Sequence, residues 1–293
     1  MADFLLCLAS LSAGGAAAVA LLLIVERLAG LRYAAKWRCL AWLLLCLRLA
    51  VPFTFSWNTE QPAAPIQFEV PADTVIYRPA TRPNPQGTPP AVQEQPNGAQ
   101  PLPEQNGPGS TKPARTVTLS EALFVVWALG AIGVLGWALL GHIRFLRYIR
   151  RWGSPILERE TGEILNELAD ALGLRRAPRL LTCPGLETPM LAGLLRPCLL
   201  LPAEPMDSAR LRHALLHELT HCKRRDILYK TLVLWVCALH WFNPAVWLMR
   251  RVVECDLELA CDDAALRVLP ESERAAYGNT VLMAATKKKG IKA

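Results

Sequence analysis

The stretch His217-Glu218-Leu219-Thr220-His221 is the strongest indication of the fold and the site in the second half of this chain. In a helix, residues four apart lie on one face, so His217 and His221 can direct two imidazole rings at one metal ion. Glu218 lies beside them, in the arrangement in which a glutamate serves as general base next to zinc. The stretch therefore predicts a helix that carries a zinc site suited to hydrolysis.

Zinc in a catalytic site needs a third protein ligand and an open position for water. The acidic stretch 254–263 lies downstream and is expected to be helical. On spacing alone, both Glu254 and Glu258 can supply the ligand, because they share one helical face. The alternative is a solvated acidic helix without a metal. Two histidines and one glutamate suit zinc best among the divalent ions, and one Zn²⁺ is expected.

Three apolar runs precede this region, and each is long enough to suggest a membrane span. They cover residues 4–25, 39–57 and 122–141, and only the second contains a charge, Arg48. A cleaved secretory signal is the alternative for the first run. The residues before it include Asp3 and no Lys or Arg, which favours a retained span.

The short loops beside these runs predict the orientation. Basic residues lie between the first two runs and directly after the third: Arg27, Arg32, Lys36, Arg38, Arg144, Arg147, Arg150 and Arg151. Both stretches are therefore expected in the cytoplasm, with the N-terminus outside. The outer segment 58–118 is rich in Pro, Gln, Asn and Gly and is expected to be an extended, mobile loop.

The predicted organisation is two spans within 1–57, the loop 58–118, a third span within 119–143 and a cytoplasmic domain from 144 to 293. Within that domain, periodicity predicts a helix over 163–172. Short strands are expected at 179–183 and 197–201. The helix of the histidine motif is expected to begin at a cap formed by Asp207 or Ser208 and to run to about Asp226.

The apolar stretch 227–249 reads like a fourth span, but a single crossing would place Glu258 on the opposite side of the membrane from His217. One metal site needs both on the same side. The stretch is therefore expected to form a re-entrant or interfacial hairpin, or a buried helix pair. Asn243-Pro244 is a natural break, because the residue before proline disfavours helix.

Composition agrees with a membrane protein. Of the 293 residues, 52% are hydrophobic, and the mean hydropathy of +0.23 is high for a soluble protein. Much of the net charge of +7 flanks the apolar runs, so no direct binding of nucleic acid is expected. The nine cysteines include no C-x-x-C pair and are expected to be reduced and buried.

Several stretches together resemble one family of proteins. They are HELTHCKRRD (217–226), His240-Trp241-Phe242-Asn243-Pro244, Glu258-Leu259-Ala260-Cys261-Asp262 and TPMLAGLLRPCLLLP (188–202), with Arg48 and Pro52 in the second span. In this order they resemble the BlaR/MecR family of membrane zinc metallopeptidases, the antibiotic-sensing signal transducers and their relatives. The resemblance covers the chain apart from the Pro-rich loop and the extreme C-terminus.

The resemblance implies a role for individual residues. It makes His217, His221 and Glu258 the metal ligands and Glu218 the base, and it decides against Glu254. Asp262 is expected to orient a ligand histidine through its ring N–H.

The resemblance also supports a place for the substrate, which is expected to lie extended beside the strand Leu191, Ala192, Gly193 and Leu194. A purely structural hairpin is the alternative there. Tyr277 is only a guess for the donor that stabilises the oxyanion.

The expected protein is thus a multi-pass, mainly α membrane protein, with three transmembrane helices and a cytoplasmic α+β peptidase domain of the gluzincin type. The expected activity is cleavage of a cytoplasmic protein, such as a DNA-binding repressor, or of the chain itself, in transmembrane signalling. The alternatives are a quality-control peptidase like the HtpX group and a non-proteolytic scaffold.

The chain ends at Ala293 without a penicillin-binding-like sensor domain. The sequence is therefore expected to be a short form of the family or a truncated one. A sensor partner or a second copy of the chain would then complete the signalling unit, and membrane lipid is a further expected partner.

Overall fold

The computed structural model describes residues 1–29, 35–52, 75–77, 117–194 and 196–290. The chain is mainly helical, as predicted. The helices are α1 (Ala2–Ala29), α2 (Ala35–Ala50), α3 (Leu119–Trp152), α4 (Arg159–Ala171), α5 (Ser208–Arg224), α6 (Asp226–Leu239), α7 (Pro244–Val268) and α8 (Glu271–Gly290). The strands are β1 (Val75–Tyr77), β2 (Val117–Thr118), β3 (Ser154–Pro155), β4 (Arg179–Cys183), β5 (Met190–Ala192) and β6 (Cys198–Pro202).

Within the described residues, two helices are long and apolar enough to cross a membrane, Ala2–Leu28 in α1 and Leu119–Trp152 in α3. Large apolar side chains cover the outer face of α3, where Leu129, Ile132 and Trp137 are 64%, 65% and 81% exposed. An apolar face of this kind suits contact with lipid. The second predicted span corresponds to α2, whose 16 residues are fewer than the roughly 20 that a straight crossing needs.

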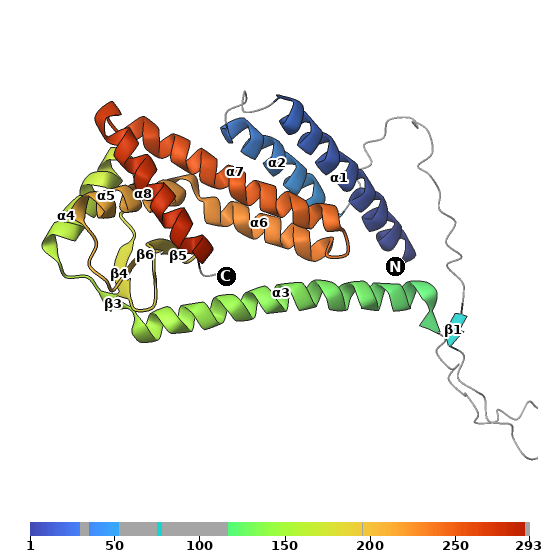
Figure 1. Ribbon diagram of the computed structural model, residues 1–293. Helices are drawn as coiled ribbons and strands as arrows, with labels where there is room; N and C mark the ends of the chain where they lie inside the picture. The colour runs from blue at the N-terminus through green and yellow to red at the C-terminus, as the bar shows by residue number, and fades with distance from the viewer. Residues whose placement is uncertain (30–34, 53–74, 78–116, 195, 291–293) are drawn as a thin grey trace, which may run out of the picture.

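The apolar stretch 227–249 folds as parts of two helices, α6 and α7, joined by a tight turn (Figure 1). The turn follows from Asn243-Pro244: the Asn243 side chain accepts a hydrogen bond from the Ala245 N–H at 3.0 Å, and proline occupies the first helical position. The turn lies among the apolar helices. Asn243 Nδ2 donates to the Ser12 carbonyl of α1 at 3.0 Å, and Trp241 Nε1 donates to the Trp127 carbonyl of α3 at 3.2 Å.

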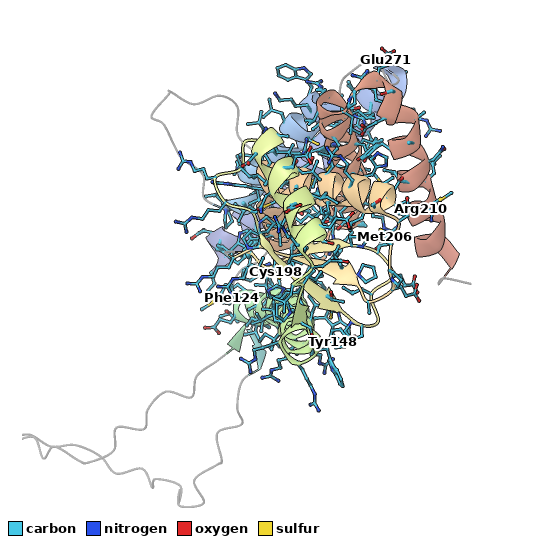
Figure 2. All side chains as sticks on the ribbon, turned by 90° about the vertical axis from the view of Figure 1, so that its left-hand side faces the viewer. Phe124, Tyr148, Cys198, Met206, Arg210 and Glu271 are labelled. Carbon is cyan, nitrogen blue, oxygen red and sulfur yellow. The ribbon has the colours of Figure 1, made fainter. Side chains whose placement is uncertain are left out.

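The remaining elements gather at the other end of the bundle, around a sheet of order β3-β4-β6-β5 (Figure 1). Strands β4 and β6 are parallel, and the other two pairs are antiparallel. β5 is an edge strand because it stands last in the strand order. Apolar side chains of α5 and β6 bury together, among them Leu199, Leu215 and Leu219. Figure 2 views this end, with Cys198 of β6 and Arg210 of α5 labelled and Tyr148 of α3 below them.

Several predicted bounds agree with this fold. β4 covers the predicted 179–183, β6 begins one residue after the predicted 197, and α4 begins before the predicted 163 and ends at Ala171. Asp207 is the N-cap of α5, but its side chain makes no capping hydrogen bond. The predicted loop 58–118 lies almost wholly outside the described residues. Of it, the structure describes 75–77 and 117–118, which pair as the antiparallel strands β1 and β2.

Candidate metal centre

Helix α5 places the two histidines of the motif on one face, as the spacing predicts. The ring centroids of His217 and His221 lie 4.7 Å apart, and their Nε2 atoms are separated by 3.1 Å. Both side chains are largely shielded from solvent, with 19% and 10% exposed. Two neighbouring imidazole nitrogens that point at one spot are a metal-binding arrangement.

A carboxylate from α7 completes the group. Oε2 of Glu258 lies 3.5 Å from Nε2 of His217 and 3.3 Å from Nε2 of His221. Ligand atoms bound tetrahedrally to one zinc ion at about 2.0–2.1 Å lie about 3.3–3.4 Å from one another. The three separations lie on both sides of this value, so the residues present fit a single zinc ion.

The other glutamate that the spacing allowed, Glu254, faces elsewhere. It forms an ion pair with Arg250 at 2.9 Å, one turn earlier on α7. The second oxygen of Glu258, Oε1, accepts a hydrogen bond from Lys230 Nζ at 3.1 Å. The other oxygen of Glu258, Oε2, therefore faces the Nε2 atoms of the two histidines.

Asp262 lies behind His217, where the predicted orienting role requires it. Its Oδ1 is 3.0 Å from Nδ1 of His217, which turns Nε2 of the same ring toward Glu258. The Tyr277 hydroxyl donates to the same carboxylate oxygen at 2.8 Å and lies 3.1 Å from Nδ1 of His217. Tyr277 thus supports the back of His217, and the guess that it faces a substrate oxyanion does not fit this position.

A second supporting carboxylate, Asp226, was not among the predicted site residues. It is buried at the start of α6, and its Oδ2 lies 2.7 Å from Nδ1 of His221. Arg224 Nε donates to both oxygens of Asp226, at 3.2 and 3.1 Å. The chain turns between these residues because Arg225 adopts a left-handed conformation, with φ of 58°. Each histidine of the motif is therefore backed by its own aspartate.

Cys261 is a further potential ligand close by. One ligand atom from each of His217, His221 and Cys261 lies within 4.8 Å of the others. However, the Cys261 Sγ donates to the His217 backbone carbonyl at 3.4 Å and lies 4.0 Å from Nδ1 of that ring. Nδ1 is the nitrogen turned toward Asp262, so the thiol lies behind the ring and not where the two Nε2 atoms meet.

Glu218 is held beside the sheet. Its Oε2 accepts a hydrogen bond from the Leu191 backbone N–H of β5 at 2.8 Å. Burial raises the pKa of Glu218 above its ordinary value, although the nearby His217 and His221 oppose this shift. A raised pKa makes the Glu218 carboxylate a stronger base.

The ligand group strongly favours its charged forms when no metal shares the site. Burial lowers the pKa of His221, but hydrogen bonds to Asp226, Cys261 and Glu258 outweigh it and raise that pKa to about 11. The pKa of Glu258 is shifted the other way. Burial raises it, and the hydrogen bonds with both histidines lower it well below its ordinary range.

The predicted substrate strand is only partly a strand. Leu191 and Ala192 belong to β5, whereas Gly193 has φ of 90° and ends the extended run, and Leu194 follows outside it. An added Cβ at Gly193 would lie 2.6 Å from the Arg196 carbonyl oxygen, so glycine is required at this turn.

Two further histidines have partners outside the ligand group. His213 lies 3.2 Å from Thr280 Oγ1 through its Nδ1. His240 is fully buried, and its Nε2 donates to the Leu49 carbonyl at 3.2 Å. The nine cysteines are all free, and five of them are buried: Cys39, Cys46, Cys183, Cys237 and Cys261.

Comparison with known proteins finds two kinds of relative. The Regulatory protein BlaR1 of Bacillus licheniformis is 28% identical over 166 residues, which are 56% of this chain and 28% of that protein. The Methicillin resistance mecR1 proteins of Staphylococcus aureus and Staphylococcus epidermidis are each 31% identical over 100 residues, 33% of this chain and 17% of each relative. The chain thus matches less than a third of the length of these relatives.

The model of a peptidase family, described as BlaR1 peptidase M56, matches residues 6–293. The match includes the apolar helices as well as the histidine motif and Glu258. The chain therefore belongs to the BlaR1 peptidase M56 family and is a protein of the metallopeptidase type.

Proposed function

We propose that this chain is a membrane-embedded zinc endopeptidase of the gluzincin type that cleaves a cytoplasmic protein during transmembrane signalling. The observation that carries the proposal is the convergence of His217 Nε2, His221 Nε2 and Glu258 Oε2, with Glu218 beside them. The names of the matched relatives, a regulatory protein and methicillin-resistance proteins, support a regulatory substrate. That substrate would be a transcriptional repressor or the chain itself.

In this proposal, His217, His221 and Glu258 hold the metal. A bound zinc ion would lower the pKa of a water molecule and polarise the scissile carbonyl. Glu218 takes the proton of the attacking water and passes it to the leaving amine. Its Oε2 is held by the Leu191 N–H, so Oε1 is the oxygen available for the proton.

The edge strand β5 is the proposed place for the substrate backbone. In the antiparallel register, Leu191 lies opposite Leu199, and its N–H points away from β6 toward Glu218. The N–H and C=O of one residue in such a strand point to the same side. The Leu191 carbonyl is therefore the group that would pair with an extended peptide next to the base. Ala192, Gly193 and Leu194 would line the continuation of this edge.

The topology is part of the proposal. Helices α1, α2 and α3 would form three spans, with the N-terminus outside and the sheet and metal centre in the cytoplasm. The basic residues at the ends of these helices support this orientation. The α6–α7 hairpin would enter from the cytoplasmic side, because its turn contacts the apolar helices and its other end carries Glu258. Membrane lipid, and a sensor partner or a second copy of the chain, are proposed partners.

The test measures zinc content and proteolysis of the detergent-purified protein, with a repressor from a neighbouring gene and self-cleavage as readouts. Wild type is expected to bind about one zinc and to cut, whereas Glu218→Gln should bind zinc and cut about 10²–10⁴-fold more slowly. Glu160→Gln, at an exposed position of α4, is the matched control and should behave as wild type.

The other outcomes separate the alternatives. Zinc in both proteins with cleavage by neither would favour a scaffold. Cleavage of misfolded membrane proteins in place of a repressor would favour a quality-control peptidase. A wild type that binds no zinc would overturn the proposal.

A further inference from the structure

A second cluster of charged side chains lies away from the metal centre and joins three helices. Arg38 of α2 forms an ion pair with Asp256 of α7, with Nη2 and Oδ1 2.9 Å apart. The indole Nε1 of Trp42, also on α2, lies 3.1 Å from Asp256 Oδ2 and 3.0 Å from Glu26 Oε1 of α1. Glu26, Arg38, Trp42 and Asp256 are called the α7 clasp below.

Most of the clasp is shielded from solvent, and Glu26 is partly exposed. The side chains of Asp256 and Arg38 are 5% and 16% exposed, and Trp42 is fully buried. A buried charge is costly unless it is paired and hydrogen-bonded, so such a cluster tolerates few arrangements of the helices around it. The position of α7 relative to α1 and α2 is therefore closely specified at Asp256.

Asp256 and Glu258 lie on the same short piece of α7. Two residues apart on a helix are turned by about 200° and separated by about 3 Å along the axis. Asp256 accordingly faces α1 and α2, while Glu258 faces His217 and His221 on α5. Because both residues belong to one rigid helical turn, a shift of Asp256 moves Glu258 by a similar distance.

Apolar packing ties the same piece of α7 to α2. Val253 and Leu257 of α7 bury in one cluster with Trp42 and Cys46 of α2. On the opposite face, the Ala260 carbonyl accepts a hydrogen bond from Arg224 Nη1 at 2.8 Å. The segment thus connects the α1–α2 pair directly to the helix of the histidine motif.

We infer that Asp256 is a positioning residue for Glu258, and that the α7 clasp makes the geometry of the metal centre depend on how α1 and α2 pack against α7. This inference rests on the proposed zinc site. A signal that shifts α1 or α2 would move Asp256 through its contacts with Arg38 and Trp42. Glu258, two residues further along α7, would move with it.

The test uses the whole 293-residue chain in detergent and three single variants. Asp256→Asn removes the charge of the clasp at α7, and Trp42→Phe removes the indole N–H and part of the buried ring while every charge stays. Trp235→Phe is the control for the loss of an indole N–H, because Trp235 of α6, which is 43% exposed, donates from its indole to the Ala50 carbonyl of α2 at 3.2 Å without contacting Asp256. The readouts are zinc affinity by chelator competition and the visible spectrum of cobalt-substituted protein, which reports coordination geometry.

We expect zinc affinity to fall about tenfold or more in Asp256→Asn and several-fold in Trp42→Phe, as for groups that orient metal ligands. The cobalt spectrum should change in both variants and stay as wild type in Trp235→Phe. The double variant Asp256→Asn with Trp42→Phe should lose no more affinity than Asp256→Asn alone, because both act through one link.

Two results would overturn the inference, and they differ. Wild-type zinc affinity and cobalt spectra in Asp256→Asn and Trp42→Phe would overturn the inference and leave the zinc site standing. A wild type without zinc affinity would overturn the proposed function, and the inference with it.

Discussion

The two polar clusters on opposite faces of α7 differ in their exposure and in what faces their carboxylates. In the α7 clasp, Arg38 and the Trp42 indole face the carboxylates, and Asp256 is only 5% exposed. In the metal centre, Lys230 binds the Oε1 oxygen of Glu258, whose side chain is 47% exposed, and the Oε2 oxygen of Glu258 faces His217 and His221. In the first cluster the carboxylates face protein donors, whereas in the second two imidazole nitrogens and a carboxylate oxygen converge on a common point.

The difference teaches how a helix can serve two purposes at once. A largely buried cluster, in which a guanidinium and an indole N–H face the carboxylates, suits a structural joint. An open cluster, whose histidines are backed by Asp262 and Asp226, suits a divalent cation and a substrate. The following predictions test this contrast, beginning with the largest effect.

The largest effect is expected from removing the carboxylate that faces both histidines. Glu258→Gln should lose most of its zinc, because a neutral amide replaces the charged ligand next to His217 and His221. Glu254→Gln, one turn earlier, should keep the zinc, since Glu254 pairs with Arg250. Metal analysis after dialysis measures both variants, and equal zinc retention would remove Glu258 from the ligand set.

The next largest effect is expected from Asp226, whose carboxylate contacts Nδ1 of His221. Asp226→Asn should weaken zinc binding about 10–100-fold, because the His221 ring loses the charged partner of its Nδ1. Asp263→Asn, on the exposed side of α7, is the control and should bind zinc as wild type does. Chelator competition provides the affinities, and similar values for the two variants would contradict the orienting role.

A smaller effect is expected from pH. The pKa of His221 is raised to about 11 in the metal-free protein, so zinc must displace a proton from its ring at neutral pH. Zinc affinity should therefore rise about tenfold per pH unit for each displaced proton. The raised pKa stabilises the metal-free protein fully below about pH 6.5, and this contribution is lost as the pH approaches 11.

The gap in melting temperature between zinc-loaded and zinc-free protein should accordingly widen from about pH 6 to about pH 8. Thermal unfolding of both forms in matched buffers measures it. A gap that stays constant or narrows would show that no proton leaves when the metal binds.

The smallest effect is expected at the thiol. Cys261→Ala should retain its zinc within about a factor of three, because Sγ donates to the His217 carbonyl behind the ring. Loss of zinc on the scale of Glu258→Gln would instead make Cys261 the third ligand. The two variants together decide which side of the histidine pair receives the metal.

Patterns over a few neighbouring residues correctly predicted several helices, strands and breaks. The i, i+4 histidines were predicted to share a face of a helix, and α5 places them there. The strand at 179–183 and the break at Asn243-Pro244 were also visible in the sequence, because alternation, proline and capping residues act over a few neighbouring positions.

The site residues that depend on long-range contacts were harder to predict. Asp226 stands five residues after His221, outside the spacing of a helical face, and only the left-handed turn at Arg225 brings it to the ring. It was present in the stretch that carried the family resemblance, but nothing in its spacing marked it. Tyr277 was offered as the donor to the oxyanion, but it contacts Asp262 and Nδ1 of His217. The position of Tyr277 in the sequence does not indicate which side of His217 it occupies.

The sequence by itself determined that two histidines and a glutamate lie on one helix and that long apolar helices accompany them, because hydrophobic periods and i, i+4 spacing are local properties of the chain. Spacing left Glu254 and Glu258 open, and the family resemblance indicated Glu258. Only the tertiary structure shows Glu258 at the histidines and Asp256 against Arg38 and Trp42. Both outcomes depend on the rotation of α7 about its axis. That rotation is set by packing against α1, α2 and α5 at once, which the sequence of α7 alone does not specify.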